Sequence, residues 1–181
     1  MIRWMAVMAA LALAAPAAAQ DMSGFTTGPV FEDFGPVADI DDADFLIPED
    51  AEFKVVLDVS AGAEGGQINR TFVSAARLIN MHDRAGIEPI KNRAVVVIHG
   101  KAVFDVLSNE AWAAKGREGE NASAGPIAEM IDMGVRFIVC GQSAAAYGVK
   151  RADFVPGVEM ALSAMTAHAL LQRDGYTVNP F

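Results

Sequence analysis

Residues 135–143 read Val-Arg-Phe-Ile-Val-Cys-Gly-Gln-Ser, an apolar run that stops at Val139 and is followed by Cys140 and a glycine-containing turn. A short apolar run bounded by a turn is typical of a buried strand. A helix is expected to follow from Ala144 to Gly148, and its free N–H groups and dipole would stabilise a thiolate at Cys140. The stretch therefore predicts a strand–turn–helix unit of a parallel α/β fold, with a thiol at the strand end where such folds place their chemistry.

The rest of the chain alternates in the same way between short apolar runs and longer helical patterns. This alternation is typical of βαβ units, and strands that are apolar on both faces need helices on both sides. We therefore predict an α/β fold: a single domain with a mostly parallel five-stranded sheet, helices on both faces and flavodoxin-like layering. The other four strands are expected at residues 53–59, 94–98, 158–161 and 176–178, and the other helices at 68–86, 102–107, 126–133 and 163–174, with 116–123 as a loop.

The chain before the first strand divides into two segments. Arg3, the apolar run of residues 5–15 and the small residues up to Gln20 fit a cleavable signal peptide over 1–19. Residues 20–52 contain many Asp and Glu but no Lys or Arg. We expect this segment to form an acidic arm that packs on the domain through its aromatic side chains Phe31, Phe34 and Phe45. The domain itself is expected over 53–181. These boundaries predict a periplasmic or secreted protein.

The charge balance excludes some partners. Lys and Arg number 14 against 23 Asp and Glu, for a formal net charge of −9. Binding to nucleic acid phosphates depends on basic side chains, so no nucleic acid partner is expected, and an anionic membrane surface is disfavoured for the same reason. After the leader, no stretch approaches the roughly 20 apolar residues that a membrane-spanning helix needs.

Cys140 is the only cysteine in the sequence. In an exported protein it cannot form an internal disulfide, so it is buried, reactive or paired with another chain. A sulfur carrier needs an accessible thiol with a depressed pKa and no second thiol that would resolve a bound sulfur into a disulfide. One cysteine at a helix start meets that need. The alternative is that Cys140 packs as a small apolar side chain.

Residues at the other predicted strand ends are further candidates. His99 ends the second strand and could act as a base beside Cys140, or could instead satisfy a backbone group. Glu64 and Gly100 follow the first two strands, where Glu64 could face the crevice or simply be solvated. Gly141, Gln142 and Ser143 could bind a sulfur anion or cap the helix. The histidines and Cys140 show no zinc-like spacing and no dinucleotide or phosphate-loop motif appears, so neither a metal nor a cofactor is expected.

Several stretches of the chain, in their order and spacing, resemble the DsrE/DsrF-like family. They are Val97-Ile98-His99-Gly100, then Gly134-Val135 with Cys140-Gly141-Gln142-Ser143, and Leu170 to Tyr176. The similarity runs from about Phe53 to Phe181, and is greatest to an exported branch with a Val-Cys-Gly-Gln motif and the ending Asn179-Pro180-Phe181.

This resemblance implies a five-stranded α/β domain that assembles into trimers or hexamers. It also implies a sulfur relay, because related cytoplasmic carriers take up a persulfide on a cysteine at a strand end and pass it to a partner protein. The resulting hypothesis is an exported protein that binds or relays sulfane sulfur through Cys140, with a donor or acceptor protein as partner. The alternative is a non-enzymatic oligomeric module that binds a small ligand or acts as a scaffold, with Cys140 as a structural residue.

Overall fold

A computed structural model describes residues 20–179 of the chain. Five parallel strands form one sheet in the order β4-β3-β2-β1-β5. The predicted five-stranded parallel sheet is thus confirmed, and both edge strands are only three residues long. The strands are β1 (Phe53–Val59), β2 (Asn92–Ile98), β3 (Arg136–Cys140), β4 (Glu159–Ala161) and β5 (Thr177–Asn179).

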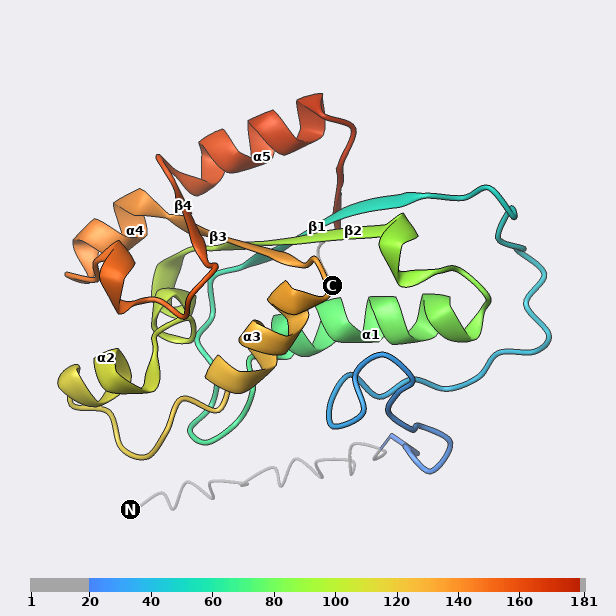
Figure 1. Cartoon of the computed structure of the whole chain (residues 1–181), viewed down its shortest axis with the longest axis horizontal. Coiled ribbons are helices and arrows are strands. Elements are labelled where there is room, and N and C mark those ends of the chain that lie inside the picture. Colours follow the sequence, from blue (N-terminus) through green and yellow to red (C-terminus); the bar gives the residue numbers. More distant parts are fainter. Residues whose placement is uncertain (1–19, 180–181) are drawn as a thin grey trace, which may run out of the picture.

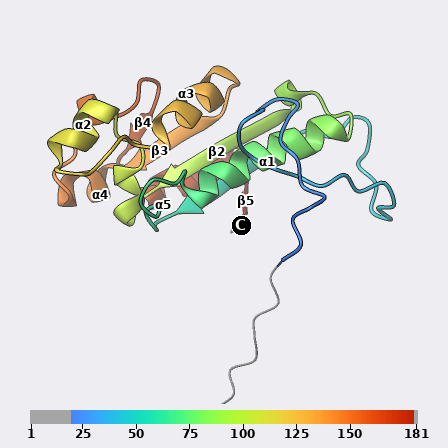
Figure 2. The ribbon, with the colours of Figure 1, turned by 90° about the horizontal axis from the view of Figure 1, so that it is seen from below.

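Helices cover both faces of the sheet (Figure 1). Helices α1 and α3 lie on one face and α5 lies on the other, as the view from below also shows (Figure 2). Apolar side chains fill the space on each side, with the larger cluster between the sheet and α1 and α3. The α-helices are α1 (Arg70–Arg84), α2 (Asn109–Ala114), α3 (Ala124–Asp132), α4 (Gly141–Ala146) and α5 (Ala164–Arg173), and the short 3-10 helices are η1 (Pro89–Lys91), η2 (Gly100–Phe104) and η3 (Arg151–Asp153).

The structure differs from the sequence prediction around two of these helices. The segment after His99 forms the 3-10 helix η2 over Gly100–Phe104, where a short helix over 102–107 was expected. Helix α2, which Ser108 caps, was not among the predicted helices. Cys140 itself belongs to β3, and α4 begins at the next residue with no intervening turn. This direct transition brings the thiol closer to the amides of α4 than a turn over residues 141–143 would.

The N-terminal segment packs on the α1 side of the sheet. Phe31 and Phe34 are buried there and stack on each other, whereas Phe45 is 95% exposed. The expectation that aromatic side chains hold this segment is therefore confirmed for the first two and wrong for Phe45. The predicted signal peptide, residues 1–19, and the final Pro180-Phe181 lie outside the described residues. Within residues 20–179, no helix combines the length and the apolar character that crossing a membrane requires.

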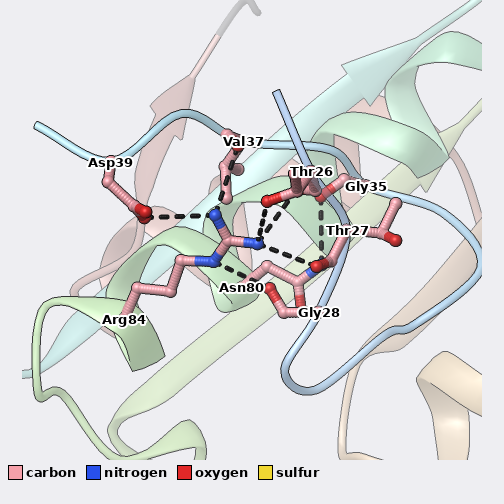
Figure 3. Close-up of polar contacts among 8 residues, drawn as sticks. All are labelled: Thr26, Thr27, Gly28, Gly35, Val37, Asp39, Asn80 and Arg84. Carbon is pink, nitrogen blue, oxygen red and sulfur yellow. Dashed lines mark hydrogen bonds and ion pairs between the residues drawn. The ribbon is translucent and has the colours of Figure 1, made fainter. Parts of the chain in front are cut away.

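Two polar side chains of α1 fasten this segment to the domain (Figure 3). The buried amide of Asn80 accepts from the backbone N–H groups of Val30 and Phe31 and donates to three carbonyls of residues 31–35. Of these partners, Figure 3 draws Gly35. Arg84, one turn further along, donates to the carbonyls of Thr26, Thr27, Gly28 and Val37 and pairs with Asp39. The segment is thus held by specific hydrogen bonds as well as by apolar packing.

Replacing Asn80 with Ala should release this segment from the domain. Buried N–H and C=O groups would lose their partners, which costs about 3 kcal/mol of folding free energy. Urea denaturation should show that loss, and limited proteolysis should cut the variant within residues 20–52. Arg70→Ala, at an exposed position on the same helix, should leave both measurements unchanged. A protease-resistant Asn80→Ala protein of full stability would contradict the role of this amide.

Candidate functional site

Cys140 lies between the starts of two helices. It is the last residue of β3 and the residue before α4, while its register partner in β4 is Ala161, three residues before α5 begins. These ends lie together at the carboxyl edge of the sheet, which is on the left in Figure 1. Cys140 is buried, with only 6% of its surface exposed.

The pKa of the Cys140 thiol lies below its usual value. Burial raises it, but hydrogen bonds from the backbone amide and hydroxyl of Ser143, and from the amides of Ala164 and Gln142, outweigh burial. These groups belong to the first turns of α4 and α5, where N–H groups have no partner within the helix. The surroundings therefore favour a thiolate, the form of cysteine that acts as a nucleophile.

The hydroxyl of Ser143 links the strand ends of β2 and β3. Its oxygen accepts a hydrogen bond from the Gly100 amide at 3.1 Å, and its single proton is directed to the sulfur of Cys140. Gly100 adopts a φ of +54°, and a Cβ there would lie 2.8 Å from the Ser60 carbonyl. A side chain at position 100 would therefore disturb this contact, which explains the glycine without assigning it a ligand.

Of the remaining predicted site residues, Gln142 meets the sulfur through its backbone amide alone, and Glu64 lies apart from it. Gln142 is exposed and donates from its side chain to the Leu162 carbonyl at 3.3 Å. Gly141 packs against the backbone of Ala161, with no room for a Cβ. Glu64 is exposed and lines a hollow beside the start of α1, which Cys140 does not line.

His99 belongs to a cluster of polar side chains that the sequence did not predict. Its Nε2 is 3.0 Å from one carboxylate oxygen of Asp58, and Nε2 of His168 is 2.6 Å from the other. Burial raises the pKa of Asp58, but the hydrogen bonds from His99 and His168 outweigh it, so the pKa lies below its usual value. Asp58 is therefore an ionised acceptor between two imidazoles.

Two signals in the sequence could have pointed to this cluster. Asp58 interrupts the apolar strand β1 at a position that alternates with the buried Val56, so it faces α5. His168 follows the buried Ala167 and precedes Leu171 by three residues, which places it on the helix face that meets the sheet. In residues 20–179, no three His, Cys, Asp or Glu side chains are arranged to hold a metal ion.

A buried carboxylate, Asp105, supports the loop that contains Glu64. It accepts from the Ala63 amide at 2.8 Å and from the side-chain amide of Asn69, the N-cap of α1, at 2.7 Å. The pKa of Asp105 is raised because burial disfavours the charged form, although these hydrogen bonds pull in the opposite direction. Asp105 thus organises the loop at the cost of burying a charge.

Asp105→Asn should make the protein more stable at neutral pH. The pKa of Asp105 is higher in the folded protein than in the unfolded chain, where it is near 3.8. The contribution of Asp105 to stability is therefore fully present below pH 3.8 and is lost as the pH rises through its pKa in the folded protein. The Asn side-chain oxygen can still accept both hydrogen bonds while carrying no charge. Melting temperatures should be similar for both proteins at pH 3 and higher for the variant at pH 7. A lower melting temperature of the variant at pH 7 would refute this account.

Comparison with known proteins identifies the family. The model of the DsrE/DsrF-like family matches residues 54–180, which is nearly the whole domain. The chain belongs to the DsrE/DsrF-like family. Two solved structures share the fold. A protein of unknown function from Methanobacterium thermoautotrophicum matches 72% of this chain and all of its own, with 19% identity and a TM-score of 0.55. The ychN protein from E. coli matches 71% of this chain and 99% of its own, with 17% identity and a TM-score of 0.50.

A comparison with curated protein sequences found no match. The DsrE/DsrF-like assignment therefore establishes the family and the fold, and the roles of individual residues have to be argued from the site.

Proposed function

We propose that this DsrE/DsrF-like protein is exported and binds or relays sulfane sulfur through Cys140. The observation that carries the proposal is the set of hydrogen bonds from Ser143, Ala164 and Gln142 that lowers the pKa of the only thiol in the chain. Members of the family are linked to sulfur relay. Cys140 lies at the carboxyl edge of the parallel sheet, which is where such a fold presents reactive groups.

The chemistry fits a carrier better than a redox enzyme. A persulfide on Cys140 ionises to an anion, and the same amides and hydroxyl that stabilise the thiolate would stabilise it. Without a second cysteine in the chain, a bound sulfur would not be lost to an internal disulfide. The sulfur would leave only when an acceptor thiol from another protein attacks it.

We further propose that the mature protein acts as a homo-oligomer in the periplasm or outside the cell, after removal of residues 1–19. Two exposed apolar side chains, Leu162 and Met165, support an interface next to Cys140. They lie before and after Ala164 in the sequence and are 73% and 81% exposed. Exposed apolar side chains of this size are common where proteins meet. Light scattering of the mature protein should report a trimer or hexamer, and a monomeric mass would contradict the proposal.

One observation favours the second candidate function, a small-ligand-binding module. A cavity of about 370 Å³ lies between the N-terminal segment, α1 and the sheet, lined by apolar side chains that include Phe25, Val55 and Leu78. In that case Cys140 would be a packing residue, which its low exposure also supports. The two functions differ in what they require of the thiol.

Intact-protein mass spectrometry separates the two functions. The mature protein would be incubated with thiosulfate, polysulfide or a small persulfide, and iodoacetamide reactivity would be followed in parallel. A sulfur carrier should gain mass in steps of one sulfur atom, about 32 Da, on the peptide that contains Cys140. A thiol that takes up no sulfur and resists alkylation in the folded protein would favour the ligand-binding module.

A further inference from the structure

Three adjacent strands end in side chains of complementary chemistry on one face of the sheet. The sheet order β3-β2-β1 places the ends carrying Cys140, His99 and Asp58 side by side. Val56, Val97 and Ile138 all pack in the cluster against α5. Because side chains alternate along a strand, the residues two positions later face the same side. These residues are Asp58, His99 and Cys140.

The register aligns the imidazole with the thiol. Ile98 of β2 is paired with Val139 of β3, and His99 continues with an extended backbone, so His99 and Cys140 are the next pair. Parallel strands lie about 4.8 Å apart, which brings such side chains within reach of one another or of one shared ligand atom. The Gly100 amide, bound to Ser143, ties the two strand ends together directly after this pair.

The hydrogen bonds to Asp58 determine which nitrogen of His99 carries the proton. An ionised carboxylate only accepts, so Nε2 of His99 and Nε2 of His168 both donate to Asp58. With its proton on Nε2, an uncharged His99 ring would carry its lone pair on Nδ1. His168 differs because its Nδ1 is buried and has no partner among the described residues. A second proton on His168 would therefore be an unsatisfied buried donor, and its ring serves to hold the Asp58 carboxylate.

We propose that Asp58 and His168 are positioning residues that orient His99 as the acid and base for sulfur transfer at Cys140. The arrangement corresponds to a thiol–imidazole–carboxylate triad assembled across β3, β2 and β1. This inference rests on the proposed function for the reaction and on the Asp58 cluster for the geometry. No direct hydrogen bond joins His99 to the thiol within residues 20–179. Such contacts often tighten only once the substrate is bound.

The step balances with a persulfide R–S–SH as donor. The Cys140 thiol gives its proton to Nδ1 of His99, and the thiolate attacks the outer sulfur of the donor. The S–S bond of the donor breaks, and its electron pair leaves on the inner sulfur as R–S⁻. His99 then returns the proton to this leaving group. The products are Cys140–S–SH and R–SH, with no net oxidation or reduction.

The test measures the initial rate of loading of the mature protein by cysteine persulfide, using intact mass. His99→Ala should load about 100-fold more slowly but reach the same final mass. Imidazole added to the buffer should restore part of that rate, because it can occupy the vacated space and carry the proton. Asp58→Asn should slow loading about tenfold, because the His99 ring loses its fixed tautomer. Arg173→Ala, an exposed position at the end of α5, should behave as the wild type.

The double variant distinguishes positioning from a structural role. If Asp58 acts through His99, adding Asp58→Asn to His99→Ala should cause no further loss of rate, whereas independent structural effects would multiply. Melting temperatures would confirm that all variants are folded. Wild-type rates in His99→Ala and Asp58→Asn, or multiplying effects without imidazole rescue, would overturn the triad.

Failure of the proposed function remains distinguishable from failure of the triad. If the wild type takes up no sulfur, the carrier proposal fails, and iodoacetamide alkylation of Cys140 in the same variants still tests the triad. A slower alkylation of His99→Ala that imidazole rescues would support the triad without sulfur relay. Loading in the wild type with unaffected variants would support the carrier and reject the triad.

Discussion

Cys140→Ser should abolish sulfur loading entirely while leaving the fold intact. Serine is close in size to cysteine, and its oxygen can accept the hydrogen bonds that Ser143 and Ala164 direct at the sulfur. The change in folding free energy should therefore stay within about 1 kcal/mol. The hydroxyl cannot form a persulfide, and the chain contains no other cysteine. The measurement is intact mass after incubation with a persulfide donor, together with urea denaturation.

Ser143→Ala provides the matched control for this loss. It keeps the thiol but removes the hydroxyl that bonds both to the sulfur and to the Gly100 amide. Loading should slow, since one hydrogen bond that lowers the thiol pKa is lost, yet the final mass should equal that of the wild type. If Cys140→Ser gained mass in steps of about 32 Da as the wild type does, sulfur would be held elsewhere and the carrier proposal would be wrong.

Gly141→Ala should destabilise the domain at the same edge of the sheet. A Cβ on Gly141 would lie 2.7 Å from the Ala161 carbonyl oxygen and 3.3 Å from that of Leu162. Both contacts are backbone, so β4 and the start of α5 would have to move. Overpacking of this kind costs about 1–3 kcal/mol. The shift would also draw the Ala164 amide away from the sulfur, so alkylation of Cys140 should slow.

The control for this substitution is Gly125→Ala. Gly125 lies in the first turn of α3, where a Cβ meets no atom within 4 Å. Alanine should stabilise that helix by about 0.5–1 kcal/mol, because it reduces the freedom of the unfolded chain. Urea denaturation of both variants gives the comparison. If Gly141→Ala were as stable as the wild type, the close approach of α4 to β4 would not constrain this position.

Local pattern was sufficient to predict the sheet and the strand end that carries Cys140. Apolar runs such as residues 94–98 form strands because every side chain on both faces is buried between helices. Helix α1 followed equally from its spacing of apolar residues. Helix α2 did not, because it buries none of its residues fully and its apolar pattern is too short to be distinctive.

Contacts between distant segments could not be derived from local pattern. Asp58 bonds to His99, which is 41 positions away in the sequence, and to His168, which is 110 positions away. Phe31 is buried where its backbone bonds to Asn80 of α1, while the similar Phe45 stays exposed. Burial and pairing of a side chain depend on which elements pack together, a property of the whole fold.

The amino-acid sequence by itself therefore determined the α/β class, the order of the main elements and the single thiol at the end of a strand. Only the tertiary structure decided what surrounds that thiol. The sheet order β3-β2-β1 aligned Cys140, His99 and Asp58, and the packing of α5 brought the Ala164 amide to the sulfur and His168 to Asp58. The physical reason is that periodicity is a local property of the chain, whereas strand order and helix docking depend on burying apolar faces from distant segments together.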